Sequence, residues 1–455
     1  MNNFANHKLL FLRRWPIRFA LLIVVAAGLA KWQASWMPTD VSVPPQALPP
    51  PSLNARDYFN AAAKLIQGPV EYAEYSTPGG TLEQRANPTS GYHVITAAEK
   101  DRIVTENLPA FQKLEEGLKY QYVEQPYHSI LGAYPSVAYR KIAFALHVAG
   151  SDRAAHRDWN GASSYYIDCM EMGVDVTHGS DLMGSTVGSG FESIGRTDGA
   201  SSVVEHLNAE QAESAARRIA ALDSGRPQLY EAIVQQKISD QAVLLQYFQK
   251  PNWRQALLHD SNAIRSNEIG YFGCLNRLLY EKPVDLSRYD IVDSIPQSLE
   301  SPRTVYGNYS TQMDRAALRA KHGAHDWDLP TDIFDLELLP DLDIADSDYS
   351  YNAAMDRLLE TRLALRAYRL RNGRYPANLN ELVPSYLPQV PIDPFSDNQL
   401  LKYRADGNMY LLYSIGPDRV DDGGKPVYNP QISGNKYTAW TPSEKGDIVA
   451  GINEN

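Results

Sequence analysis

The sequence predicts a mostly α-helical protein with an N-terminal membrane anchor, a large helical domain and a small α+β domain at the C-terminus. Three observations predict this fold class: a basic and apolar N-terminus, helical periodicity over most of the chain, and a hairpin pattern near its end. The chain of 455 residues is long enough for two or three domains. Its net charge of −11 argues against nucleic acid as a partner, because phosphate binding requires clustered positive charge.

Residues 1–37 have the composition of a membrane anchor. Basic residues precede an apolar run from Phe19 to Ala30, which extends with two tryptophans to Met37. The extended run approaches the roughly 20 residues that cross a bilayer, and its basic flank places the remaining chain outside the cytoplasm. We therefore expect a single-pass protein of the bacterial inner membrane, held in the membrane by its N-terminal helix. A cleaved signal peptide is the alternative, since Gly28-Leu-Ala30 resembles a cleavage site.

Two segments are predicted to connect the domains. Residues 38–53 contain six prolines, which favour an extended spacer. Residues 326–348 carry nine acidic residues and no basic one, a composition typical of a solvated connector. These segments divide the chain into an anchor at 1–37, a helical domain at 54–325 and an α+β domain at 349–455.

Local capping patterns predict where helices begin in the helical domain. Asn54 is a predicted N-cap, and Thr96 and Asn208 each begin a capping-box pattern. Another helix is expected to begin at Pro109, because proline is tolerated in a first turn. The clearest further helices are expected at 137–148, 159–176, 209–225 and 228–250.

Residues 137–179 weakly resemble a tetratricopeptide-like helical hairpin. The resemblance rests on a short helix, the small-residue turn Ala149-Gly150-Ser151-Asp152 and an aromatic-rich second helix, without a second copy at a fixed period. The glycine-rich stretch Gly184–Gly195 follows. It lacks the spacing and the βαβ context of a phosphate-binding loop, so its small residues are expected to let two helices pack closely.

The predicted C-terminal domain carries the most specific motifs of the chain. A helix over 349–371 is expected to end in a left-handed cap at Asn372-Gly373. Two strands are expected at 400–404 and 409–413, because Asp406-Gly407 between them is a strong short hairpin signal. In order, the motifs are Asn372-Gly-Arg-Tyr-Pro376, Pro391-Ile-Asp-Pro394, Ser414-Ile-Gly-Pro-Asp-Arg-Val-Asp-Asp-Gly-Gly424 and a last strand at Gly446-Asp-Ile-Val449.

This order of motifs resembles the periplasmic domain of the major pseudopilin of type II secretion systems. The resemblance implies a long helix with an antiparallel sheet, and a calcium ion held by the loop after the hairpin. Asp418, Asp421 and Asp422 occupy the matching positions, and Asp447 could add a ligand; such oxygen ligands suit calcium. Alternatively, the aspartates form only a surface turn. A pseudopilin joins its membrane segment directly to this helix, whereas residues 38–348 intervene here, so packing into a pseudopilus is not expected.

The sequence predicts no catalytic residue and no cofactor-binding residue apart from these calcium ligands. We expect a non-enzymatic envelope protein whose helical domain and pseudopilin-like domain contact a protein partner. The alternative is an exported hydrolase with its active site in the helical domain. A buried Glu171 or Glu192 in a large polar cleft would favour that alternative. His259-Asp260 and His325-Asp326 could serve a nucleophilic serine, but no GxSxG motif occurs.

Cysteine and histidine are too sparse to predict a disulfide framework or a zinc site. Cys169 and Cys274 are the only cysteines, and we expect two buried thiols, with a disulfide between them as the alternative. His322 and His325 stand three residues apart, but an intervening glycine and the lack of a third ligand argue against metal binding.

Overall fold

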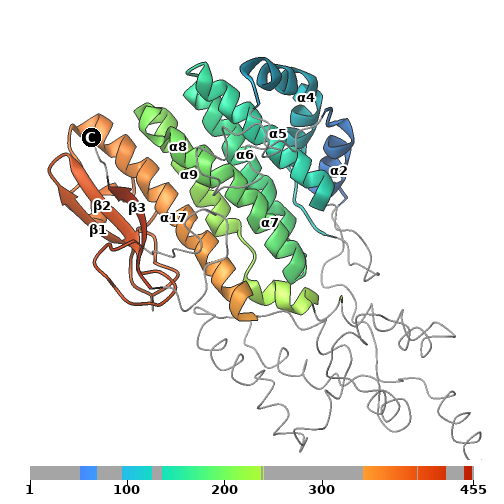
Figure 1. Ribbon diagram of the computed structural model, residues 1–455. Helices are drawn as coiled ribbons and strands as arrows, with labels where there is room; N and C mark the ends of the chain where they lie inside the picture. The colour runs from blue at the N-terminus through green and yellow to red at the C-terminus, as the bar shows by residue number, and fades with distance from the viewer. Residues whose placement is uncertain are drawn as a thin grey trace, which may run out of the picture. The chain divides into compact units, whose positions relative to one another are not determined.

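The computed structural model describes residues 52–68, 95–124, 136–236, 239, 342–396, 398–426 and 445–452. They lie in one compact unit, which comprises Pro45–Ser239, Val292–Gln312 and Pro340–Asn455. The described part is mostly helical and contains a three-stranded antiparallel sheet (Figure 1). In chain order, the elements are α2 (Ala55–Leu65), α4 (Ala97–Gly117), α5 (Ser136–Ala155), α6 (Trp159–Thr177), α7 (Leu182–Gly195), the π-helix η1 (Arg196–Ala200), α8 (Ser201–Val203), η2 (Val204–His206), α9 (Ala209–Gly225), α17 (Leu342–Asn372), η5 (Leu379–Leu382), β1 (Lys402–Asp406), β2 (Met409–Ser414) and β3 (Ile448–Ile452).

Several predictions fall on residues outside the described part. They concern the anchor, the proline-rich spacer up to Pro51, the end of the helix expected at 228–250, most of the acidic connector, and His259, Cys274, His322 and His325. Among the described residues, no helix has both the length and the apolar character needed to cross a bilayer.

Side-chain caps begin three helices as the sequence predicts. The Asn54 side chain accepts a hydrogen bond from the backbone N–H two residues later, at 3.0 Å. Thr96 and Asn208 form complete capping boxes with Glu99 and Gln211. These side chains satisfy amide groups that have no partner within the first helical turn.

The predicted helix start at Pro109 is wrong, because α4 begins at Ala97 and runs through this proline. An interior proline removes a helical hydrogen bond and costs about 3 kcal/mol. Apolar residues are buried on both sides of Pro109, and their burial offsets this cost. They are Ile103, Val104, Phe111 and Leu114.

The turn expected after residue 148 is also absent, since α5 continues to Ala155. A Cβ atom at Gly150 would lie 2.4 Å from the ring of Tyr166 on α6. The glycine therefore lets two neighbouring helices approach each other and does not end α5. A comparable difference occurs at α17, which begins at Leu342, seven residues before the expected start at 349.

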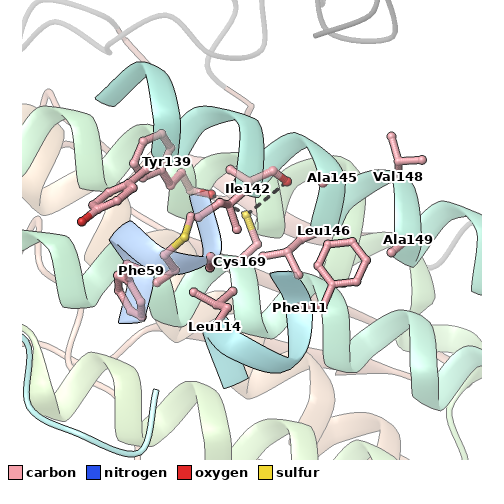
Figure 2. Packing of buried hydrophobic residues seen from close by; sticks show 14 of the residues in the cluster. Phe59, Phe111, Leu114, Tyr139, Ile142, Ala145, Leu146, Val148, Ala149 and Cys169 are labelled. Carbon is pink, nitrogen blue, oxygen red and sulfur yellow. Dashed lines mark hydrogen bonds between the residues drawn. The ribbon is translucent and has the colours of Figure 1, made fainter. Parts of the chain in front are cut away.

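Three clusters of buried apolar residues hold the described helices and the sheet together. The first cluster joins α2, α4, α5, α6 and α7, and includes Phe59, Leu114, Ile142 and Cys169 (Figure 2). Cys169 is a buried free thiol, as expected. The second cluster joins α6, α9 and α17, and the third joins α17 to the sheet.

The long helix α17 contributes to two of these clusters with different residues. Leu359 and Leu363 belong to the cluster with α9, whereas Leu358 and Leu365 belong to the cluster with the sheet. The helix therefore lies between α9 and the sheet (Figure 1). In consequence, the described parts of the predicted helical domain and the predicted C-terminal domain share buried apolar residues.

The sheet has the strand order β1-β2-β3, with each neighbouring pair antiparallel. β1 and β2 form the predicted hairpin, in which Asp406 pairs with Met409. Gly407 in the turn has φ +60°, a left-handed conformation that glycine adopts without steric cost. The predicted last strand is also present, as β3.

Candidate functional site

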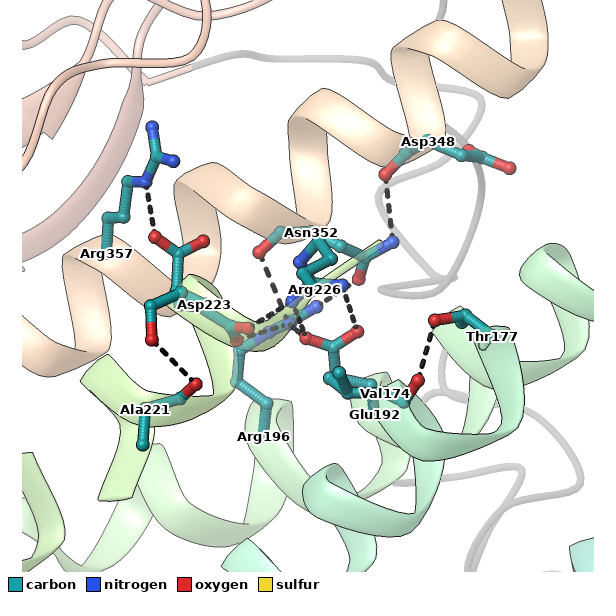
Figure 3. Close-up of polar contacts among 12 residues, drawn as sticks. Val174, Thr177, Glu192, Arg196, Ala221, Asp223, Arg226, Asp348, Asn352 and Arg357 are labelled. Carbon is teal, nitrogen blue, oxygen red and sulfur yellow. Dashed lines mark hydrogen bonds and ion pairs between the residues drawn. The ribbon is translucent and has the colours of Figure 1, made fainter. Parts of the chain in front are cut away.

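Two arginines and two carboxylates meet in the interior of the described unit, between α7, α9 and α17 (Figure 3). We call Glu192, Arg196, Arg226 and Asp356 the charge cluster. Arg196 Nη1 donates hydrogen bonds to Asp356 Oδ1 at 2.7 Å and to Glu192 Oε1 at 3.3 Å. Arg226 donates to both Glu192 oxygens, at 2.9 and 2.5 Å, and to Asp356 Oδ2 at 2.5 Å.

Local structure brings these four side chains together from distant parts of the sequence. Glu192 lies in the last turn of α7 and Arg196 begins the π-helix, a wider turn that often marks a functional or strained position. Arg226 follows the last residue of α9, and Asp356 lies on α17. Asn352, one turn before Asp356, accepts a further hydrogen bond from Arg196 Nη2 at 2.5 Å.

Burial makes the charge cluster costly unless every charge has a partner. The side chains of Glu192, Arg196 and Asp356 are 0% exposed, and that of Arg226 is 4% exposed. Burial acts to raise the pKa of Glu192, but Arg226 and then hydrogen bonding with Asp356 outweigh it and lower this pKa to about 2. Burial, followed by the neighbouring Glu192 carboxylate, raises the pKa of Asp356 well above its usual value. The two carboxyl groups therefore hold their protons with different strengths.

A small pocket lies beside the charge cluster, with a volume of about 30 Å³. Arg226, Asp348 and Tyr349 line it together with hydroxyl groups from α7, and burial raises the pKa of Asp348 to about 6. A pocket of this volume has room for one or two water molecules, whereas ligand pockets usually measure about 300–1,000 Å³. It is not the large polar cleft that would favour a hydrolase.

Glu171 does not share the environment of Glu192. It lies on α6 and accepts a hydrogen bond from Arg218 of α9 at 2.7 Å, next to Asp168, which accepts from the same guanidinium at 2.8 Å. The Glu171 side chain is 28% exposed. Of the two glutamates considered from the sequence, only Glu192 is buried, and its charge is fully compensated by arginine.

Asp393 of the Pro391-Ile-Asp-Pro394 motif has a structural role that the sequence analysis did not predict. Its carboxylate accepts hydrogen bonds from Ser414 Oγ at 2.7 Å and from the Ile415 N–H at 2.8 Å, and it is 1% exposed. It also accepts from the Phe395 N–H at 2.9 Å. Asp393 thus joins two of the sequence motifs, immediately before the aspartate-rich loop.

The three predicted calcium ligands lie on one loop, from Asp418 to Asp422, and each makes different contacts. Asp418 accepts a hydrogen bond from the Val420 N–H at 3.1 Å. Asp421 accepts from Tyr413 Oη at 2.9 Å and from the Gly423 N–H at 3.0 Å. Asp422 is exposed. The carboxylates of Asp418 and Asp421 therefore support the loop backbone that carries them.

Asp447, considered as a fourth ligand, connects the loop to the start of β3. Its carboxylate accepts hydrogen bonds from the backbone N–H groups of Asp422, Gly424 and Lys425 at 3.3, 2.6 and 3.2 Å. Within the part of the chain that the structure describes, no three His, Cys, Asp or Glu side chains are grouped closely enough to hold a metal ion. The aspartates have the chemistry that calcium requires, but the loop does not bring them together in this conformation.

Comparisons with known proteins do not identify this site. The chain matches no protein-family model, no functionally characterised protein and no solved structure.

Proposed function

We propose that the chain is a membrane-anchored, exported envelope protein that contacts a protein partner and has no enzymatic activity. In this proposal the N-terminal segment holds the chain in the inner membrane. The helices and the pseudopilin-like C-terminal part present surfaces outside the cytoplasm, and calcium stabilises the loop at Asp418, Asp421 and Asp422.

The compensation of the charge cluster is the observation that carries the non-enzymatic proposal. A catalytic carboxyl group must reach substrate, and its proton must be free to transfer. Glu192 and Asp356 are 0% exposed and are hydrogen-bonded to two arginines. The neighbouring pocket of about 30 Å³ is too small for a substrate. These features support a role in joining helices and give less support to an exported hydrolase.

Asp393 supports the pseudopilin-like part of the proposal. The resemblance depends on the order of short motifs, and Asp393 joins two of these motifs by hydrogen bonds. By binding Ser414 and the Ile415 N–H, it fixes the point at which the chain leaves β2. The aspartate-rich loop begins there. Buried Asp393 would therefore hold the start of the loop in place when the loop binds a calcium ion.

Calcium binding is tested by thermal unfolding of the full chain in calcium and in EDTA. A ligand that binds only the folded state raises the midpoint, by linkage. We expect calcium to raise it, and we expect Asp418→Ala combined with Asp421→Ala to abolish the rise. Asp406→Ala is a matched control, because Asp406 is an exposed carboxylate in the neighbouring hairpin. An equal midpoint in calcium and EDTA would remove calcium from the proposal.

Export is tested separately with alkaline phosphatase, which is active only outside the bacterial cytoplasm. The reporter is fused after residue 53, at the end of the predicted spacer. An active fusion that remains with the membrane after alkaline washing is expected. An active but soluble fusion would indicate a cleaved signal peptide, and an inactive fusion would contradict export.

A further inference from the structure

Glu360 is a buried carboxyl group that the charge cluster does not include. It lies on α17 and is 4% exposed. Helical spacing places it on the same side as Asp356, four residues earlier, and Leu363, three residues later. Leu363 packs in the apolar cluster with α9, so Glu360 lies at the interface between α17 and α9.

The two charged groups nearest to Glu360, Asp223 and Arg357, form their hydrogen bonds with other partners. Asp223 faces it from α9, and Arg357 lies one turn before it on α17. Arg357 Nε donates to Asp223 Oδ2 at 2.8 Å, and its Nη1 donates to the Ile392 carbonyl oxygen at 2.8 Å.

The arginines of the neighbouring charge cluster are likewise engaged. Arg196 comes from the π-helix after α7 and Arg226 from the end of α9, and both bind Glu192 and Asp356. Among the residues that the structure describes, none forms a hydrogen bond or ion pair with the Glu360 carboxyl group.

A buried carboxyl group without a partner favours its neutral form, because ionisation in a low-dielectric environment is unfavourable. Burial and then the Asp223 carboxylate raise the pKa of Glu360 to about 8, against the opposing effect of Arg357. In an open state, Glu360 would be hydrated and would ionise near its ordinary pKa of 4.5. The closed interface therefore binds a proton more tightly than the open one.

We propose that the protonation of Glu360 controls the docking of α17 on α9, so that the interface is tight in mild acid and loosens in mild alkali. Ionised Glu360 gains hydration when the helices separate, and the same separation exposes Leu359 and Leu363. Because α17 also packs on the sheet, its release would change how the C-terminal part is held against the helices. This inference does not depend on the proposed function, since it concerns contacts within the chain.

Linkage gives the sign and the size of the expected effect. Raising the pH from about 4.5 to about 8 should increase the opening constant of the interface, by a factor that approaches tenfold per pH unit for one linked proton. Below pH 4.5 the open and closed states are both protonated, so the dependence disappears.

Hydrogen exchange of the full chain between pH 5 and pH 8, corrected for the intrinsic exchange rate, tests the proposal. Peptides from α17 and α9 should lose protection as the pH rises, whereas peptides from α5 should not. Glu360→Gln should weaken the pH dependence, because glutamine preserves the shape of the neutral side chain and leaves only Asp348 and Asp356 on α17 with a raised pKa. Glu210→Gln on α9 is the matched control, since Glu210 is exposed, and it should leave the dependence unchanged.

Two further variants keep the proposal falsifiable if Glu360→Gln disturbs the fold. Glu360→Met removes the ionisable group and provides an apolar side chain of similar length, so it should weaken the dependence to the same extent. Asp223→Asn removes a negative neighbour and releases Arg357, so it should move the pH midpoint to a lower value. The proposal is overturned if Glu360→Gln retains the wild-type dependence in α17 and α9, or if all helices lose protection together.

Discussion

The Asp356 carboxylate and the Arg196 guanidinium lie 2.7 Å apart in the protein interior, although 160 residues separate them in the sequence. Their contact joins α17 to the π-helix that follows α7. Removing one partner of a buried pair leaves the other group without its partner, whereas replacing both with apolar residues of similar volume is often neutral or stabilising. The structural importance of the pair is therefore best measured by comparing single and double variants.

Asp356→Ala should destabilise the protein by about 1–3 kcal/mol, because it removes a buried acceptor of hydrogen bonds from Arg196 and Arg226. Urea unfolding of the full chain measures this change. The double variant Arg196→Met, Asp356→Leu should be more stable than Asp356→Ala, because Arg226 and Glu192 then remain as a neutral pair. If the losses of stability in the single variants Arg196→Met and Asp356→Leu add up to the loss in the double variant, the two residues are not energetically coupled.

Close packing of α6 on α7 predicts opposite effects for two glycines of α7. A Cβ at Gly188 would lie 2.5 Å from the Gly173 carbonyl oxygen, whereas a Cβ at Gly190 would meet no atom within 4 Å. Gly188→Ala should therefore cost about 1–3 kcal/mol through overpacking. Gly190→Ala should stabilise the helix by up to about 1 kcal/mol, because alanine has the higher helix propensity. Urea unfolding distinguishes the two, and a stabilising Gly188→Ala would contradict the close approach.

The helix starts could be predicted because a capping box is local: Thr96 and Glu99 are three residues apart, and their hydrogen bonds need no other part of the chain. The glycine-rich stretch was also interpreted correctly as a helix-packing surface, since Gly188 contacts Gly173. The sequence predicts a turn at Gly150 and cannot show its actual role, because the residue that requires this glycine, Tyr166, lies on another helix.

The candidate site could be predicted only in part, for the same reason. The sequence indicates Glu192 as a candidate buried glutamate, but its partner Arg226 lies 34 residues away, and Asp356, which Arg226 also binds, lies 130 residues beyond Arg226. Asp393 belongs to one of the sequence motifs, but its structural role depends on Ser414, 21 residues away. Such roles follow from tertiary contacts, which periodicity and capping patterns do not specify.

The helix α17 packs on both α9 and the sheet. We therefore predict that residues 349–455 will not fold as an isolated fragment. Leu359, Leu363 and Ala367 are buried in the cluster with α9, and Asp356 is bound by arginines that the fragment lacks. The fragment would expose the apolar side of the helix and leave Asp356 without its partners. Circular dichroism should show no cooperative urea transition for the fragment, in contrast to the full chain. A sharp two-state transition would show that the C-terminal part is an autonomous domain.

Shifted carboxyl pKa values predict that the full chain loses stability as the pH rises from 5 to 8. Burial raises the pKa of Asp168 and of Asp348 to about 6, and that of Glu360 to about 8. A raised folded-state pKa means that stability decreases as the pH rises from the unfolded-state value through the folded-state value. Glu192 acts in the opposite direction, because its pKa is lowered to about 2 and its stabilising contribution is lost as the pH falls from about 4.5 through 2.

These two ranges meet at mildly acidic pH, where the raised groups are still protonated and Glu192 is ionised. Each unit of pKa shift corresponds to about 1.4 kcal/mol, so the free energy of unfolding should fall by several kcal/mol between pH 5 and pH 8. Urea unfolding across this range measures the change, and Glu360→Gln should remove part of it; Asp175 and Asp356, whose pKa values are also raised by burial, contribute to the rest. A constant free energy of unfolding from pH 5 to pH 8 would mean that Glu360 is ionised in the folded protein, which would require a positive partner at the α17–α9 interface.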